Sequence, residues 1–196
     1  MNLRLAAFAL PTLATLAVGA SAADQFTLDP VHTFALFKVQ HFGAGISVGR
    51  FDTAGGTLTW DAADASKNAI TVTIQADSVS TGSDEASKKR DGHLKAADFL
   101  SAKEFPTLSF KSKSFTKVDD VTFKVDGDFT LRGKTKPLSI TVKKTGQGKL
   151  PATMGGKDVV GFETVFTISR KEFGVEYGPG AVGDTVTIEF YTEANK

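Results

Sequence analysis

Residues 121–131 read VTFKVDGDFTL, and this stretch decides the fold class. Apolar residues take the odd positions, apart from Gly127, whereas threonine, lysine and aspartate take the even ones. A period of two places successive side chains on opposite faces of a strand, and one polar face is typical of an antiparallel sheet. The same alternation recurs at residues 69–76, 136–144 and 184–193. The pattern therefore predicts an all-β chain.

The alternating runs divide the chain into about eight strands. We predict them at residues 32–42, 46–52, 56–61, 69–76, 107–115, 121–131, 136–144 together with 159–169, and 184–193. Glycine pairs such as Gly55-Gly56 and Gly155-Gly156 mark turns between runs. Several runs reach about ten residues, or roughly 33 Å, which is more typical of a barrel than of a small sandwich. We expect an antiparallel eight-stranded β-barrel.

One segment, residues 83–100 (SDEASKKRDGHLKAADFL), has no period of two and predicts one or two short helices. Ser83 is a plausible N-cap, with Asp84 and Glu85 in the first turn, where the helix dipole favours acids. Gly92 is expected to break the helix.

The N-terminal residues 1–22 have the features of a secretory signal peptide. Arg4 precedes an apolar run, and Ala20-Ser21-Ala22 is a small-x-small cleavage site that puts the cut near Ala22/Ala23. The apolar run falls short of the ~20 residues that span a bilayer, so a membrane anchor is the less favoured alternative. Residues 23–196 are then expected to form a single exported domain.

The composition excludes several functional classes. The 23 basic residues nearly balance 22 acidic ones, which argues against a nucleic-acid binder with its clustered basic excess. The absence of cysteine excludes a disulfide framework, Cys-ligated zinc and thiol catalysis. No segment beyond the signal peptide is long and apolar enough to form a stable membrane span.

Motifs for catalysis or metal binding are weak. Residues 45–49 (GISVG) match the G-x-S-x-G nucleophile pattern, but a strand rather than a helix follows them. His32 and His41 are nine residues apart, which on an unbroken strand places them on opposite faces. Asp91 and His93 lack a third ligand nearby in sequence. We predict no catalytic residue, no metal site and no cofactor; an enzyme using His32, Asp91 or His93 on a lipid headgroup is a less favoured alternative.

Fifteen of the 16 phenylalanines lie beyond residue 22, and they need an apolar interior. An eight-stranded barrel is wide enough to be filled by side chains or to hold one small ligand. Strand parity predicts a set of apolar residues that line such a tube and bind a ligand there. They are Phe37, Val39, Phe110, Phe123, Phe129, Phe166 and Phe190. Sequence leaves open whether these rings fill the tube or surround a channel.

The densest basic cluster includes Lys88, Lys89, Arg90, His93 and Lys95. A solvated helix face is the simpler interpretation. The alternative is an anion site at a cavity mouth, where Arg90 and His93 would meet the polar head of a ligand.

A set of motifs recurs in order along the chain and resembles one family. The motifs are LDPVHT (28–33), HF (41–42), VGRF (48–51), DSVSTG (77–82), RDGHL (90–94), DFL (98–100), FPTLSF (105–110), GDFTLRGKTKP (127–137), SRKEFG (169–174) and VGDTV (182–186). Together they strongly resemble the bacterial YceI-like family, also called polyisoprenoid-binding periplasmic proteins. Leu100 departs from the pattern, because a second aromatic residue is common there.

The resemblance implies a lipocalin-like barrel, a periplasmic location and a long apolar ligand such as a polyprenyl compound or a fatty-acid amide. The resemblance implies no enzymatic activity. We therefore expect a periplasmic carrier whose partner is an isoprenoid or another fatty-chain lipid. A packed, stress-related scaffold without a ligand is the alternative, and the sequence leaves open whether the chain forms a homodimer.

Overall fold

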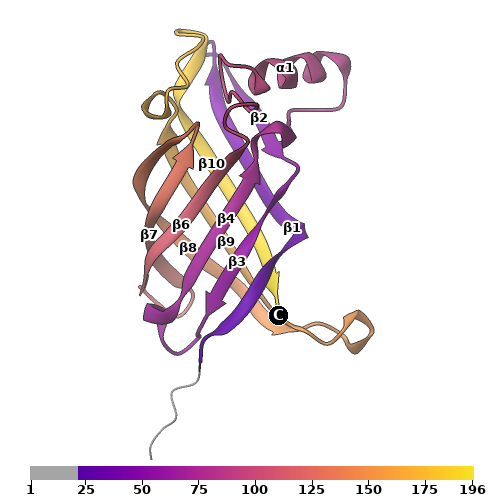
Figure 1. The fold of residues 1–196 in the computed structure, drawn as a ribbon, viewed down its shortest axis with the longest axis vertical. Coiled ribbons are helices and arrows are strands. Elements are labelled where there is room, and N and C mark those ends of the chain that lie inside the picture. Colours follow the sequence, from indigo (N-terminus) through magenta and orange to yellow (C-terminus); the bar gives the residue numbers. More distant parts are fainter. Residues whose placement is uncertain (1–21) are drawn as a thin grey trace, which may run out of the picture.

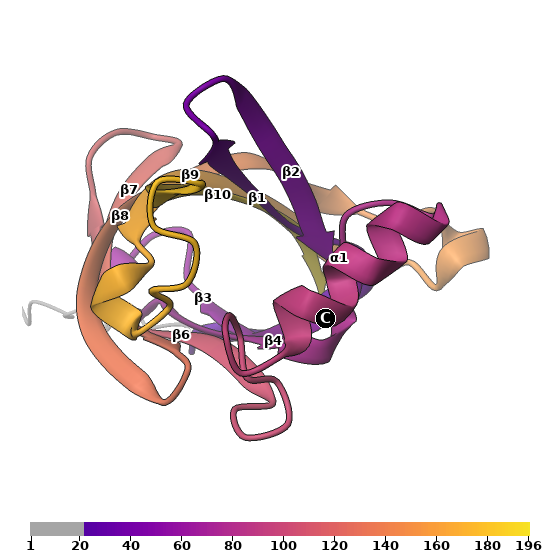
Figure 2. The same cartoon turned by 90° about the horizontal axis from the view of Figure 1, so that it is seen from above.

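The computed structural model describes residues 22–196, which form a β-barrel with one α-helix at its upper end (Figures 1 and 2). The signal-peptide prediction therefore lies outside the described residues, apart from Ala22. The strands are β1 (Asp24–His41), β2 (Gly45–Phe51), β3 (Ala54–Trp60), β4 (Ala69–Gln75), β5 (Val79–Ser80), β6 (Thr107–Lys117), β7 (Thr122–Leu131), β8 (Lys134–Lys149), β9 (Asp158–Ser169) and β10 (Val182–Asn195). The helix α1 spans Glu85–Lys95, and short 3-10 turns lie at Ala65–Lys67, Ala76–Ser78, Ala152–Met154 and Lys171–Phe173.

Every pairing between these strands is antiparallel, and the pairing of β10 with β1 closes the ring. Both β2 and β3 pair with β1, along different parts of its length, so they act as one bent strand. In the same way, β4 pairs with β3 and β5 with β2. The barrel therefore has eight strands, as predicted.

The division of the chain into those eight strands differs from the prediction. The runs at 46–52 and 56–61 are two parts of one bent strand, whereas 136–144 and 159–169 belong to the separate strands β8 and β9. Alternation identifies a strand but cannot tell a bend from a turn, and this explains both differences.

All of the stretch that decided the fold class except Val121, which is 39% exposed, forms β7, and every odd position within β7 is buried. Gly127 is one of these buried positions, and neighbouring atoms of β6 leave no space for a side chain there. A Cβ at this position would lie 2.6 Å from the ring of Phe110 and 2.6 Å from the carbonyl oxygen of Lys111. The neighbouring strand β6 has a register irregularity just beyond, between Ser112 and Ser114. Glycine therefore lets β6 approach β7 closely where β6 bends.

Strand β1 begins at Asp24, eight residues earlier than predicted, and contains a bulge between Leu28 and Thr33. Leu28 and Thr33 are both buried although their numbers differ in parity, because the bulge exchanges the two faces of the strand. Asp29 organises the bulge: its carboxylate accepts from the backbone N–H of Val31 at 2.9 Å and lies 2.7 Å from Nδ1 of His32.

The histidine in this bulge gives a pH-dependent prediction. The hydrogen bond to Asp29 raises the pKa of His32 above its ordinary value of 6.5, and the bond from His32 lowers the pKa of Asp29. The charged pair therefore supports the fold fully between about pH 4 and about pH 6.5. It loses this contribution as the pH rises through the raised pKa of His32 or falls through the lowered pKa of Asp29. NMR titration of the ring should give a pKa above 6.5, and Asp29→Asn should lower it toward the ordinary value, with the nearby Glu193 still raising it slightly. An unchanged midpoint in Asp29→Asn would contradict the pairing.

The carboxylate of Glu193 lies 3.9 Å from the same ring nitrogen of His32. The three groups offer ligand atoms within 4.8 Å of one another, a spacing that a metal ion also tolerates. His32 and Glu193 are each half exposed, and the hydrogen bond explains why His32 lies beside Asp29. The geometry therefore gives no reason to assign a metal here.

The N-cap of helix α1 lies one residue later than proposed, and the helix passes through Gly92. Asp84, rather than Ser83, is the N-cap, and its carboxylate accepts from the backbone N–H of Ser87 at 3.0 Å. Gly92 does not break the helix, because a single glycine costs only about 1 kcal/mol relative to alanine and the flanking contacts hold the turn. These contacts include the hydroxyl of Thr81, which donates to the buried carboxylate of Asp91.

The lower part of the barrel is filled. The ring of Trp60 packs edge to face against Phe123, at 5.3 Å between centroids, and against Phe162, at 5.0 Å. Phe115 adds a further ring against Phe123, and all four residues are buried. These rings form the floor of the barrel, and we use this name for Trp60, Phe115, Phe123 and Phe162 below.

Candidate functional site: an apolar cavity above the floor

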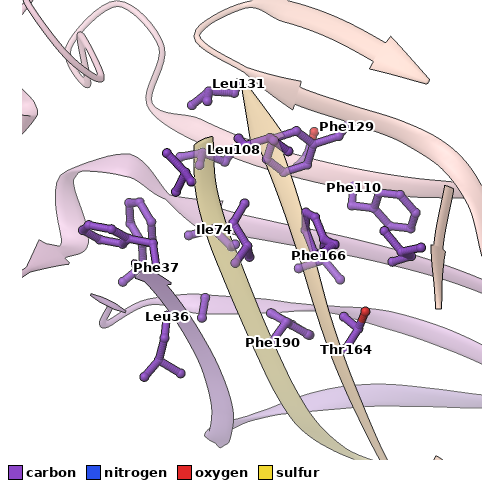
Figure 3. Close-up of a pocket in the computed structure, with 18 of the residues that line it drawn as sticks. Leu36, Phe37, Ile74, Leu108, Phe110, Phe129, Leu131, Thr164, Phe166 and Phe190 are labelled. Carbon is purple, nitrogen blue, oxygen red and sulfur yellow. The ribbon is translucent and has the colours of Figure 1, made fainter. Parts of the chain in front are cut away.

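Above the floor, the barrel encloses a cavity of about 180 Å³. Its wall is apolar, and inward-facing side chains from opposite strands surround it (Figure 3). Ile74 and Leu108 approach from the paired strands β4 and β6, and Phe166 and Phe190 come from β9 and β10. At the upper end the lining residues Phe37, Val39 and Leu94 are only partly buried, so the cavity meets solvent there. We call this end the mouth.

The cavity is deep and narrow. Phe162 and Arg170 both border it from the inner face of β9 and its continuation, eight residues apart. This separation corresponds to roughly 26 Å along a strand, or roughly 20 Å along the barrel axis at a tilt of about 40°. The volume is below the ~300–1,000 Å³ typical of pockets for drug-sized ligands. Such a channel suits one extended chain better than a compact ligand.

Six of the seven predicted lining residues border the cavity, namely Phe37, Val39, Phe110, Phe129, Phe166 and Phe190. The rings of Phe129 and Phe166 lie 6.2 Å apart and edge to face. Phe123 does not border the cavity, because it lies at the lower end of β7 and belongs to the floor. The contact of any of these residues with a ligand stays a prediction.

The helical segment supplies lining residues that strand parity missed. Leu94, near the end of α1, and Phe99 and Leu100, which follow it, all border the cavity. They place the segment across one side of the mouth (Figure 2). Leu100, the position that departs from the family pattern, therefore belongs to the cavity wall.

Arg170 is the charged residue at the upper end of β9, and only 4% of it is exposed. Its guanidinium donates to four backbone carbonyls of the segment 175–183, namely those of Val175, Tyr177, Val182 and Gly183, at 2.7–2.9 Å. Burial lowers the pKa of this guanidinium, and the nearby charge of Asp184 opposes that shift. One side chain thus fixes the loop that forms the other side of the mouth.

Three rings join the two sides of the mouth. His93, Phe99 and Tyr177 pack edge to face, with centroids 5.0–5.3 Å apart. Nε2 of His93 also lies 3.1 Å from the carboxylate of Asp98. His93 is exposed and does not border the cavity, so its prediction as a contact for a polar head stays untested.

Arg90, the other residue predicted to meet a polar head, is used in hydrogen bonds within the protein. Its Nε donates to the hydroxyl of Thr81 at 2.7 Å, and its Nη2 donates to the hydroxyl of Ser87 at 3.0 Å. Arg90 does not border the cavity. The structure shows it holding α1 against the end of β5, and a role toward a ligand stays a prediction.

Comparison with known proteins gives a consistent group of relatives. A family model described as a YceI-like domain matches residues 26–194. A UPF0312 protein from Pseudomonas putida is 33% identical over 193 residues, covering 97% of this chain and 96% of the relative. Protein YceI from Salmonella arizonae is 36% identical over 176 residues, covering 87% and 88%.

Solved structures share the fold. A Campylobacter jejuni YceI protein has a TM-score of 0.67 at 28% identity and covers 76% of this chain and 84% of its own. A polyisoprenoid binding domain from Saccharophagus degradans, implicated in plant cell wall breakdown, has a TM-score of 0.63 at 14% identity, covering 89% and 99%. Within residues 22–196, no helix has the length and apolar character needed to cross a membrane.

Proposed function

The chain belongs to the YceI-like family, and from this premise we propose that it is a lipid-binding protein that holds one long apolar chain in the upper half of its barrel. The observation that carries the proposal is the apolar cavity above a filled floor. Each CH₂ group transferred from water into such a site contributes about 0.8 kcal/mol. A chain therefore gains affinity with every carbon that enters, up to the depth of the floor.

An isoprenoid chain is the first candidate ligand. The Saccharophagus degradans domain, which shares the fold, is a polyisoprenoid binding domain. The cavity wall is mostly apolar, and Thr164 and Arg170, two polar residues that border it, donate to backbone carbonyls, so the head is expected to stay at the mouth while the chain enters. A fatty acyl chain satisfies the same geometry, and the experiment below separates the two.

We propose further that the protein works in the periplasm as a carrier and catalyses no reaction. The predicted signal peptide supports the location. The polar residues around the mouth support the absence of catalysis, because Arg170 and Arg90 are occupied in hydrogen bonds that hold loops in place. A nucleophile paired with a base, as covalent catalysis needs, is not found among the residues that border the cavity.

Native mass spectrometry of the exported protein tests the proposal directly. We expect a co-purified lipid, and extraction with fragmentation distinguishes an isoprenoid from a fatty acyl chain. In vitro, the fluorescent polyene cis-parinaric acid reports on binding, because the single Trp60 in the floor can transfer excitation energy to it. A protein that carries no lipid and binds neither parinaric acid nor a farnesylated probe would support the ligand-free scaffold instead.

Filling the cavity should abolish most of this binding. Leu108→Trp places an indole in the space opposite Ile74 and should displace about three CH₂ groups of the chain, which costs about 2.4 kcal/mol or roughly 50-fold in affinity. The matched control is Val118→Trp, because Val118 is 64% exposed at the opposite end of the barrel. Equal affinities of the two variants for parinaric acid would place the lipid site elsewhere.

A further inference from the structure

The tip of the β1–β2 hairpin exposes a group of apolar side chains at the mouth end of the barrel. Phe42 is 67% exposed, Ile46 62% and Val48 48%. Ile46 and Val48 are two residues apart on one strand and so share its outer face. Single exposed apolar residues are ordinary on a protein surface, but three in one hairpin near the mouth of an apolar cavity call for an explanation.

The backbone fixes the position of Phe42. This residue has a φ of 51°, in the left-handed region that bulky residues rarely adopt. Its N–H donates to the carbonyl of Ala181 at 2.7 Å, and its ring packs against His41 at 4.5 Å. The hairpin tip is thereby joined to the loop that Arg170 holds. The strained conformation keeps an apolar ring in solvent, which gains nothing for the isolated fold.

Basic side chains occupy the same end of the barrel. Helix α1 carries Lys88, Lys89, Arg90 and Lys95, against Glu85 and the buried Asp91. Lys88 pairs with Glu85 at 2.7 Å and Arg90 donates to Thr81 and Ser87, so Lys89 and Lys95 are the cations that this argument depends on. The helix and the hairpin tip both lie at the upper end of the molecule (Figure 1). An apolar group and a basic group at the same end of the molecule match a bilayer surface that contains anionic lipid, where apolar side chains enter the interface and cations meet headgroups.

We propose that the mouth end, through Phe42, Ile46, Val48 and the cations of α1, docks on an anionic bilayer surface. The purpose of such docking rests on the proposed function: the mouth would face the bilayer, and a lipid chain could enter the cavity without crossing water. A second copy of the chain fits this surface less well. A two-fold interface would set the same basic helix near its own copy, and like charges would oppose association.

Vesicle co-sedimentation tests docking separately from cavity binding. The vesicles contain phosphatidylethanolamine with a minority of phosphatidylglycerol. We expect wild-type protein to bind them, and Phe42→Ser with Ile46→Ser to weaken binding roughly tenfold or more. The matched control is Val118→Ser with Met154→Ser, which removes residues of 64% and 61% exposure at the opposite end and should bind as wild type. Lys89→Gln with Lys95→Gln should reduce both the affinity and its dependence on salt.

The outcomes separate the two proposals. Hairpin variants that bind parinaric acid as wild type but lose the vesicles support docking. Vesicle binding by a protein that holds no lipid in its cavity supports docking and overturns the proposed function. Docking is overturned if wild-type protein does not bind the vesicles or if the hairpin variants bind them as wild type does. It is also overturned if light scattering shows that wild type is a dimer and the hairpin variants are monomers, because the surface would then bind a second copy of the chain.

Discussion

Replacing Arg170 with methionine should lower the free energy of unfolding by about 3–5 kcal/mol, because a buried carbonyl that loses its donor costs about 1–3 kcal/mol and water can reach some of the four. Methionine retains the apolar stem of the side chain but donates no hydrogen bond. The carbonyls of Val175, Tyr177, Val182 and Gly183 lose their shared partner. Urea unfolding followed by circular dichroism measures the change.

Two variants make the result specific. Arg170→Lys retains the charge but presents a single ammonium group, which cannot reach four carbonyls in the planar arrangement of a guanidinium. We expect it to recover less than half of the loss. Lys171→Gln alters the exposed neighbouring side chain and should change stability by less than about 0.5 kcal/mol. A loss below 1 kcal/mol in Arg170→Met would show that the loop is held by other contacts.

Phe123→Ala should destabilise the protein by about 3–5 kcal/mol, because removing a buried ring from a filled region leaves a void that its neighbours cannot close. Phe123 is 4% exposed and packs against both Trp60 and Phe115. The corresponding change in the upper half, Phe166→Ala, should cost about 1–2 kcal/mol. Phe166 is only partly buried and one side of its ring already faces open space, so fewer contacts are lost there.

Denaturant unfolding of the two alanine variants in parallel gives this comparison. The protein should first be freed of lipid, since a bound chain would stabilise the folded state and mask the difference. The fluorescence of Trp60 should respond strongly to Phe123→Ala and weakly to Phe166→Ala, because Phe123 packs against the indole and Phe166 does not. Equal losses would mean that the upper half is packed as tightly as the floor.

The sequence predicted most of the barrel because alternation survives wherever a strand is straight. In β7 every odd position is buried, and Phe110 and Phe190 face inward as their parity requires. The prediction failed where the pattern changes phase. The bulge in β1 inserts three extra residues between Leu28 and Thr33, so even-numbered residues such as Phe26 and Leu28 are buried before it, whereas odd-numbered residues such as Thr33 and Ala35 are buried after it.

The cavity was harder to predict than its wall. Parity separates inward from outward side chains, but it does not tell that Phe123 is packed and Phe166 faces space, since that depends on volumes from distant strands. The role of Arg170 could have been found. It continues the inward parity of Phe162, Phe166 and Ile168, so a buried charge was to be expected at the end of β9. The contribution of Leu94 and Phe99 had no comparable signal, because their segment lacks a period of two.

The pairing that closes the barrel joins the two ends of the described chain. Thr27 lies opposite Asn195, a separation in sequence of 168 residues, whereas the other pairings along the ring join neighbouring segments. Bringing such distant residues together carries the largest loop-closure entropy, so this seam should form late in folding. A chain that emerges with its N-terminus first can assemble a curved open sheet, but the ring is completed only after β10 has emerged. Until then the apolar face of the sheet is accessible, and a lipid present at this stage could be enclosed as the seam forms.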